Sequence, residues 1–153
     1  MKVPFCRQPG SDPAIALPAY ETAGAAGADI RANLPQGQRA DGITLDPMVR
    51  SLIPTGFSVA LPHGWEMQVR PRSGLALKHG LTVANAPGTV DADYRGEVRI
   101  LLVNLGSDPV MISHGDRIAQ VVFAQVSQMT FELVDSLPGT QRGADSFGST
   151  GLT

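Results

Sequence analysis

The chain has 153 residues, which is enough for one domain with its own hydrophobic core. Its formal net charge of −2 gives no broad positive surface, so binding of nucleic acid through the phosphates is not expected. No segment approaches the roughly 20 consecutive apolar residues that cross a bilayer, which argues against a membrane protein. The single cysteine, Cys6, cannot form an internal disulfide, and the start of the chain lacks the apolar core of a signal peptide. We therefore expect a cytoplasmic protein.

Short strands are predicted in the first half of the chain. Its 17 glycines and 12 prolines are spread evenly, which is typical of many short elements joined by turns. Residues 43–45 form one predicted strand. Apolar residues alternate over 57–61 and again over 65–69, and Pro62-His63-Gly64 lies between them as a turn. This pattern predicts a β-hairpin.

One segment, residues 73–79, predicts a helix. Ser73 is a favoured N-cap residue, and Gly80 follows the last predicted helical residue, where glycine is common. A helix start carries unpaired N–H groups, so Arg72, Ser73 and Gly74 form a candidate phosphate cradle. The alternative is an ordinary capped helix beside a surface arginine.

The second half of the chain predicts more strands and then a tail. Residues 88–96 have the composition of a hairpin, and residues 96–104, 110–113, 118–126 and 129–134 have the composition of strands. The predicted fold is therefore all-β, a jelly-roll-like double sheet or barrel with one short helix. From residue 138 the apolar periodicity stops, which predicts a β domain over residues 1–137 and a mobile C-terminal tail over 138–153.

The segment between Gly88 and Gly96 contains a candidate catalytic carboxylate. Asp91 and Asp93 are two residues apart, so they share one face if the backbone is extended. A carboxylate held there could deprotonate water if phosphates lay nearby, and Tyr94 could form a wall against a ring. The alternative is a turn that Asp91 only caps.

Three further polar residues interrupt apolar or glycine-rich surroundings. Gln120 lies within a run of apolar residues, where an unsatisfied amide costs roughly 1–3 kcal/mol, so we expect it to bond either the sheet backbone or a ligand. Arg117 nearby is either a surface salt-bridge residue or an anion contact. Asp29, which follows Gly27 and Ala28, either closes a turn or lies near a metal.

The C-terminal segment from Arg142 to Gly151 combines one arginine, one phenylalanine and hydroxyl groups with glycines. An ordered state in which Phe147 stacks on a ligand while Arg142, Ser149 and Thr150 meet phosphates would explain this composition. A disordered tail is the alternative.

Taken together, five segments resemble the trimeric deoxyuridine triphosphatase (dUTPase) family, and they occur in the family's order. The resemblance covers the chain from about Leu17 to Gly151. The matching segments are AGADIRA (26–32), PRSGLA (71–76), GTVDADYRG (88–96), GDRIAQVVF (115–123) and RGADSFGSTG (142–151). One departure is Asp145 and Ser146, where the family commonly has glycines, although we still expect the tail to close over the ligand.

The resemblance implies hydrolysis of dUTP to dUMP and pyrophosphate, which limits uracil incorporation into DNA and supplies dUMP for dTMP synthesis. It implies that Asp91 is the general base that orients a water for attack on the α-phosphorus. Tyr94 would stack under the deoxyribose and exclude a ribose 2′-hydroxyl. The other substrate-binding residues that it implies are Arg72, Ser73, Gly74, Asn85, Thr89, Val90, Arg99, Gln120, Arg142, Phe147, Gly148, Ser149 and Thr150.

The resemblance also implies a metal and an assembly. Mg²⁺ would be the cofactor, supported by Asp29 through water, and the protein would form a homotrimer whose sites take residues from more than one subunit. Two other functions remain open. One is a dCTP deaminase of the same fold, and the other is a non-catalytic jelly-roll module that binds nucleotides.

Overall fold

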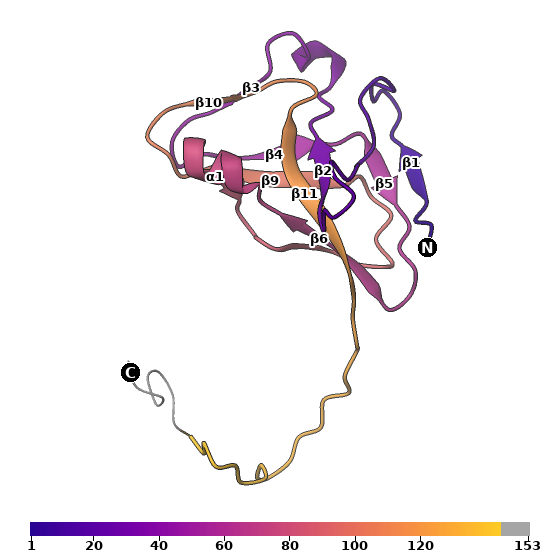
Figure 1. Cartoon of the computed structure of the whole chain (residues 1–153), viewed down its shortest axis with the longest axis vertical. Helices are drawn as coiled ribbons and strands as arrows, with labels where there is room; N and C mark the ends of the chain where they lie inside the picture. The colour runs from indigo at the N-terminus through magenta and orange to yellow at the C-terminus, as the bar shows by residue number, and fades with distance from the viewer. Residues whose placement is uncertain (145–153) are drawn as a thin grey trace.

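The computed structural model describes residues 1–144, and almost all of its regular structure is β-strand. The elements in chain order are β1 (Phe5–Arg7), β2 (Ala28–Arg31), η1 (Gln36–Gln38), β3 (Ile43–Leu45), β4 (Arg50–Pro54), β5 (Phe57–Val59), β6 (Trp65–Arg70), α1 (Ser73–His79), β7 (Leu81–Val83), β8 (Gly88–Val90), β9 (Arg99–Asn104), β10 (Val110–Ile112) and β11 (Arg117–Gln125). The predicted all-β fold with one short helix is confirmed (Figure 1).

The strands form two larger antiparallel sheets and two strand pairs. One sheet has the order β2-β11-β6-β8 and the other β4-β9-β7, while β1 pairs with β5 and β3 with β10. Apolar side chains from both larger sheets meet in one core. Its largest fully buried side chains include Phe57, Ile30, Leu34, Leu45, Ile53, Met67, Leu81, Ile100, Leu102 and Ile118.

The sheet built on β11 places alternate residues on opposite faces. Ala119 and Val121 face the core and are fully buried, whereas Gln120 between them is only half-buried. Gln120 lies opposite Asp29 on β2 and opposite Arg70 on β6. Because residues directly opposite each other in a sheet share a face, three distant parts of the sequence bring polar side chains together on the outer face.

The two predicted hairpins are wrong. The turn at Pro62-His63-Gly64 forms, since the Trp65 N–H donates to the Pro62 carbonyl, but β5 pairs with β1 while β6 pairs with β11 and β8. Residues 88–96 likewise do not fold back on themselves, because β8 pairs with β6 and the next strand, β9, with β4 and β7. Both strand pairs separate because each strand finds a distant partner that completes the buried core.

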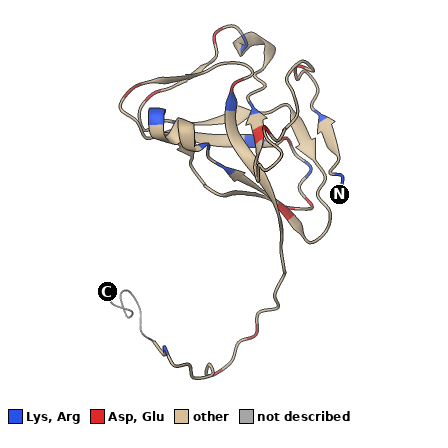
Figure 2. Cartoon of the chain, viewed as in Figure 1, with Lys and Arg blue, Asp and Glu red and all other residues tan. Residues whose placement is uncertain are grey.

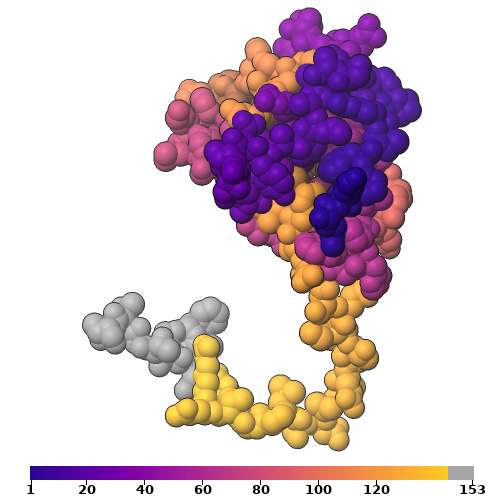
Figure 3. Space-filling view, turned by 45° about the vertical axis from the view of Figure 1, so that its right-hand side comes forward, coloured from indigo at the N-terminus to yellow at the C-terminus, as the bar shows by residue number. Residues whose placement is uncertain are grey.

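The predicted strand over residues 129–134 is also wrong. These residues have no regular structure and are exposed, with the side chains of Phe131 and Leu133 at 96% and 99% exposure. Figures 1 and 3 show the chain leaving the body after β11 rather than lying against it. Alternating apolar residues make a strand only where a partner strand lies beside them, and none does here among residues 1–144. The boundary between body and tail at residue 138 stays a prediction.

The helix begins and ends where the sequence predicts. α1 spans Ser73–His79, although Arg72 rather than Ser73 is its N-cap and no side chain caps it. Gly80 ends the helix with a φ of 66°, and a Cβ there would lie 2.3 Å from the backbone nitrogen of Gly106. Only glycine meets both requirements.

Charged residues do not gather into one large patch. In Figure 2 acidic and basic residues are interspersed over the body, in keeping with the small net charge. Within residues 1–144, α1 is much too short to cross a membrane, and no other helix qualifies.

Candidate functional site

Four charged side chains form a connected ion-pair group on the outer face of the β11 sheet, which we call the Asp29 cluster (Glu21, Asp29, Arg72 and Arg117). The Arg72 Nε lies 3.4 Å from Asp29 Oδ1, and a terminal nitrogen of Arg117 lies 3.2 Å from Asp29 Oδ2. That same Arg117 nitrogen lies 3.2 Å from a Glu21 carboxylate oxygen. The Asp29 side chain is only 14% exposed, so these ion pairs are partly shielded from water.

A β-bulge explains how Arg117 reaches this face. Arg117 and Gln120 are three residues apart, so in a regular strand they would point to opposite faces. The register of β11 against β2 shifts between Arg117 and Ala119, which adds a residue to that side of the ladder. The bulge lets Arg117 and Gln120 approach Asp29 from the same strand. Sequence reasoning left the role of Arg117 open because a bulge has no clear sequence signal.

Gln120 is satisfied by a loop rather than by the sheet. Its Nε2 donates to the Pro71 carbonyl at 3.0 Å, which ties β11 to the segment just before α1. A Cβ at residue 27 would lie 2.3 Å from the Gln120 Oε1, so Gly27 is the residue that makes room for the amide. The predicted candidates Asp29, Arg72 and Gln120 are therefore brought together.

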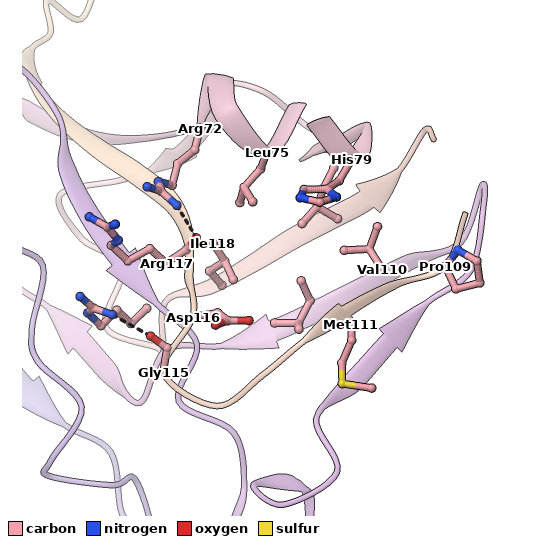
Figure 4. Close-up of a pocket in the computed structure, with 13 residues that line it drawn as sticks. Arg72, Leu75, His79, Pro109, Val110, Met111, Gly115, Asp116, Arg117 and Ile118 are labelled. Carbon is pink, nitrogen blue, oxygen red and sulfur yellow. Dashed lines mark hydrogen bonds between the residues drawn. The ribbon is translucent and has the colours of Figure 1, made fainter. Parts of the chain in front are cut away.

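The two arginines of the cluster border a hollow of about 530 Å³ between α1 and β10 (Figure 4). Arg72 Nη1 donates to the Arg117 carbonyl at 2.9 Å, drawn as a dashed line in Figure 4. Arg31 also lines the hollow, but it donates to the Gly115 carbonyl at 2.9 Å. Ser73 and Gly74, on the first turn of α1, are exposed to solvent. Arg72, Ser73 and Gly74 therefore offer basic and polar groups to an anion.

A second group surrounds the loop after β8. The hollow there has a volume of about 350 Å³ and is lined by Leu52, Thr89, Val90, Asp91, Tyr94, Glu97, Val98 and Arg99. Asp91 is exposed, and its carboxylate makes no hydrogen bond or ion pair with any residue in the range 1–144. Residues 91–94 form the turn of the alternative reading, closed by the Tyr94 N–H donating to the Asp91 backbone carbonyl at 3.2 Å, but the Asp91 side chain does not cap it.

Tyr94 is held across the loop backbone. Its hydroxyl donates to the Glu97 carbonyl at 2.9 Å, and 45% of the residue is exposed. A Cβ on Gly96 would lie 2.4 Å from that hydroxyl, so glycine is required beneath the ring. The hydroxyl is thus held while the residue stays partly exposed, and the role of Tyr94 as a wall against a ligand ring stays a prediction.

Glu97 was missed by the sequence reasoning. One of its carboxylate oxygens accepts the Gly56 N–H at 3.0 Å, and the other lies 3.3 Å from the Arg99 Nε. Glu97 therefore anchors both the loop and Arg99. Its position between an exposed glycine and the buried Val98 is the signal that could have revealed it.

Asn85 lies in the turn before β8. It is exposed, and a Cβ at Gly88 would come within 3.1 Å of its side-chain nitrogen. Thr89 is exposed on the edge strand and Val90 is half-buried. Edge-strand backbone and an amide side chain can together offer donors and acceptors to the edge of a planar ring.

The two groups are separated within one chain. Asp91 follows Val90, which lies opposite Met67 on β6, whereas Gln120 lies opposite Arg70 and one strand further away. At about 3.3 Å per residue and about 4.8 Å per strand, Asp91 and Gln120 differ by roughly 13 Å along the strands and roughly 10 Å across them. Asp91 and Gln120 of one chain therefore do not reach the same phosphoryl group.

The tail residues are placed only in part. Arg142 is exposed in a turn near the end of the described range. The candidates Phe147, Gly148, Ser149 and Thr150, and the departures Asp145 and Ser146, lie outside the described residues.

A family model described as dUTPase matches residues 14–151 of this chain. This chain belongs to the dUTPase family. It is 55% identical over 151 residues to the deoxyuridine 5′-triphosphate nucleotidohydrolase of Dinoroseobacter shibae, and the match covers 99% of this chain and 97% of that one.

Solved structures of dUTPases share the family's jelly-roll-like fold. A dUTPase variant of Staphylococcus bacteriophage 80alpha, solved with dUpNHpp, has a TM-score of 0.78 at 23% identity and covers 99% of both chains. A dUTPase variant from phage phi11 of S. aureus, whose structure describes coordination of a structural Mg(II) ion, has a TM-score of 0.73 at 19% identity and covers 91% of this chain and 100% of that chain. These likenesses confirm the predicted fold.

Proposed function

We propose that this dUTPase-family protein hydrolyses dUTP to dUMP and pyrophosphate by attack of water on the α-phosphorus. The observation that carries the proposal is the Asp91 carboxylate, which makes no hydrogen bond or ion pair with residues 1–144 and lines a hollow together with Tyr94. An acceptor with no protein partner is free to take a proton from water, which a general base must do. The Dinoroseobacter shibae relative bears the name of this activity.

The loop after β8 would bind the nucleoside. Asn85 and the backbone of Thr89 and Val90 would pair with the uracil edge, and the ring of Tyr94 would lie under the deoxyribose. The hydrogen bond of Tyr94 to the Glu97 carbonyl fixes this wall, so a ribose 2′-hydroxyl would meet it. Arg99, held by Glu97, would approach the substrate from the same side.

Arg72, the member of the Asp29 cluster next to α1, would bind the phosphates together with Ser73, Gly74 and Gln120. Arg72 is held in place before any ligand binds, which lowers the entropy lost on binding. From the tail, Arg142, Gly148, Ser149 and Thr150 would add phosphate contacts and Phe147 would cover the base. Catalysis would come from positioning and charge stabilisation, without a covalent intermediate.

Asp29 fits a supporting role toward Mg²⁺. An ionised carboxylate has about four acceptor sites, and the arginines of the cluster use one on each oxygen, which leaves room for metal-bound water. No group of three acidic, histidine or cysteine side chains within residues 1–144 could hold an ion alone, which suits a metal bound mainly by water and substrate phosphates. When bound, Mg²⁺ would offset phosphate charge and polarise the phosphoryl oxygens.

We also propose a homotrimer with shared sites. The distance between Asp91 and the Asp29 cluster would be closed if a second copy supplied the cluster. A second support is the exposed apolar segment over residues 126–137, which includes Phe131 and Leu133 and which a monomer would leave in water.

The exposed thiol of Cys6, which forms no disulfide, suits the reducing cytoplasm. There the enzyme would keep uracil out of DNA and supply dUMP for dTMP synthesis.

The test is a pyrophosphate-release assay on dUTP, dTTP, dCTP and UTP with Mg²⁺, with ammonia measured in parallel. We expect pyrophosphate from dUTP alone at a substantial rate. Ammonia released from dCTP would instead support the deaminase, and tight dUTP binding without turnover would support the non-catalytic module.

A further inference from the structure

Arg72, which we expect to bind phosphate, is only partly engaged by the protein. Its Nε lies 3.4 Å from Asp29 Oδ1 in an ion pair, and its Nη1 donates a hydrogen bond to the Arg117 carbonyl at 2.9 Å. A guanidinium has five N–H donors, so these contacts leave three for a ligand. The ion pair between Arg72 and Asp29 is therefore monodentate, although arginine and carboxylate groups often form bidentate pairs.

Arg117 contacts Asp29 Oδ2, the oxygen that a bidentate pair with Arg72 would also use. Its terminal nitrogen lies 3.2 Å from Asp29 Oδ2, so each oxygen of Asp29 has its own arginine. The same nitrogen lies 3.2 Å from Glu21, which holds the Arg117 side chain from its other side. The signs along the cluster alternate, with Glu21 and Asp29 negative and Arg117 and Arg72 positive. None of the proposed phosphate or base contacts requires Arg117 or Glu21.

We propose that Arg117 is a positioning residue for the triphosphate. The Arg117 side chain contacts Asp29 Oδ2 and so prevents a bidentate ion pair between Asp29 and Arg72. The remaining N–H donors of Arg72 then stay available for phosphate. The inference rests on the proposed function, since it assigns Arg72 to the phosphates. The β-bulge that turns Arg117 toward Asp29 would then serve substrate binding as well as the fold.

A double-mutant cycle separates this role from direct contact with phosphate. If Arg117 acts only through its contact with Asp29, then substitution of Arg117 should no longer weaken binding once the Asp29 charge has been removed. We would measure dUpNHpp binding by calorimetry, with and without Mg²⁺, for the wild type, Arg117→Gln, Asp29→Asn and the double variant. Omission of Mg²⁺ keeps the metal role of Asp29 from entering the cycle.

The expected result is a strong dependence on the residue at position 29. Arg117→Gln should weaken dUpNHpp binding by about tenfold or more in the wild-type background, and by less than about threefold in the Asp29→Asn background. In steady-state assays over a range of dUTP concentrations, KM should rise by a larger factor than kcat falls. Equal losses in both backgrounds would show direct phosphate contact and overturn the proposal.

The matched control is Arg31→Gln. Arg31 lies directly opposite Arg117 in the sheet and lines the same hollow, but it donates to the Gly115 carbonyl rather than to Asp29. It removes the same charge from the same hollow, and we expect less than about a threefold loss of binding. A loss as large as that of Arg117→Gln would mean that only the general positive field matters, which would also overturn the proposal.

Two further measurements keep the outcome clear. Thermal unfolding would be followed for every variant, and if Arg117→Gln does not fold, Arg117→Met takes its place in the cycle with the same criteria, since methionine fills much of the same space but carries no charge for Asp29 or Glu21. If the wild type itself fails to bind dUpNHpp, the proposed function fails and the inference fails with it. If the wild type binds and the cycle shows no coupling, only the inference fails.

Discussion

The Asp29 cluster and the loop that carries Asp91 are built in opposite ways. In the cluster, side chains from four separate segments hold one another through ion pairs of 3.2–3.4 Å before any ligand is present. In the loop, the tyrosine and arginine are held by Glu97, but the carboxylate of Asp91 has no partner among residues 1–144.

This difference follows from what each group is proposed to do. Groups that bind charge gain from being fixed in advance, because less freedom is lost when the ligand arrives. A general base must instead accept a proton from water, and positive charges beside it would oppose that protonation. Of the two carboxylates, Asp29 is suited to positioning the phosphate-binding groups, and Asp91 is suited to accepting a proton from water.

The largest expected effect is the loss of turnover in Asp91→Asn. The amide cannot accept the proton from water, so kcat should fall by about 10²–10⁴-fold while dUpNHpp binding changes little. The matched control is Asp93→Asn, a change of the same kind two residues away on the same exposed loop. Pyrophosphate release measures both. An active Asp91→Asn protein would remove the distinction between the two carboxylates.

The second prediction tests whether the two groups meet across subunits. Arg72→Gln and Asp91→Asn should each be nearly inactive alone, but mixed trimers made by co-expression should regain activity. If each site draws the two residues from different copies, about a quarter of the sites in a random mixture are intact. Pyrophosphate release from the mixture is the measurement.

Its control is a mixture of the wild type with a variant carrying both substitutions. That mixture should also keep about a quarter of its sites intact if the residues come from different copies, and about half if they come from one. A mixture of the two single variants that stays inactive would place Asp91 and Arg72 in one chain's site, against the separation of Asp91 from Gln120, beside the Asp29 cluster, that the strand register gives.

The third prediction concerns selectivity for the sugar. Tyr94→Ala removes the wall that the Glu97 carbonyl holds in place, so the preference for dUTP over UTP should fall by about tenfold. Tyr94→Phe keeps the ring and loses only its hydrogen bond, so it should retain most of the preference. Competition of UTP against dUTP measures both, and unchanged discrimination in Tyr94→Ala would remove the ring from the selectivity argument.

Local signals in the sequence predicted local structure well. The helix over 73–79 was found to the residue, and glycine acts at its end within one turn, although Ser73 does not cap its start. The strand over 43–45 was also found, and the strand predicted over 110–113 ends one residue earlier, at Ile112. Strand partners were not, because the choice between a hairpin and a distant strand depends on which pairing buries the core.

The site shows the same limit. Asp29, Arg72 and Gln120 were identified as candidates, but their contacts depend on a register that joins residues about 90 positions apart, and on a bulge. The strand predicted over 129–134 failed for the opposite reason, since its alternation is real but no partner lies beside it among residues 1–144. Alternation of apolar and polar residues predicts that a segment can form a β-strand. Whether the strand forms depends on a partner strand that the tertiary structure places beside it.

The smallest expected effect lies outside both groups and separates stability from catalysis. Asp12 Oδ1 accepts the Ala14 N–H at 2.8 Å, and Asp12 Oδ2 lies 3.2 Å from His114 Nε2. The Ala14 hydrogen bond first, and then the His114 ring, hold the pKa of Asp12 below its usual 3.8. His114 Nδ1 accepts the Leu34 N–H at 3.0 Å, so the neutral ring carries its proton on Nε2, facing Asp12.

The sign of the pH dependence follows from the lowered pKa. The folded state binds the Asp12 proton less readily than the unfolded state, so this contribution to stability is present above pH 3.8 and is lost as the pH falls through the lower pKa of the folded state. Asp12→Asn should lower the Tm by about 1–2 °C at pH 7 and by less at pH 3. The control is Asp41→Asn, an exposed carboxylate with no side-chain partner among residues 1–144. An equal drop in Tm at both pH values would show that Asp12 contributes through packing rather than charge, while kcat at pH 7 should not change in either case because Asp12 is in neither group.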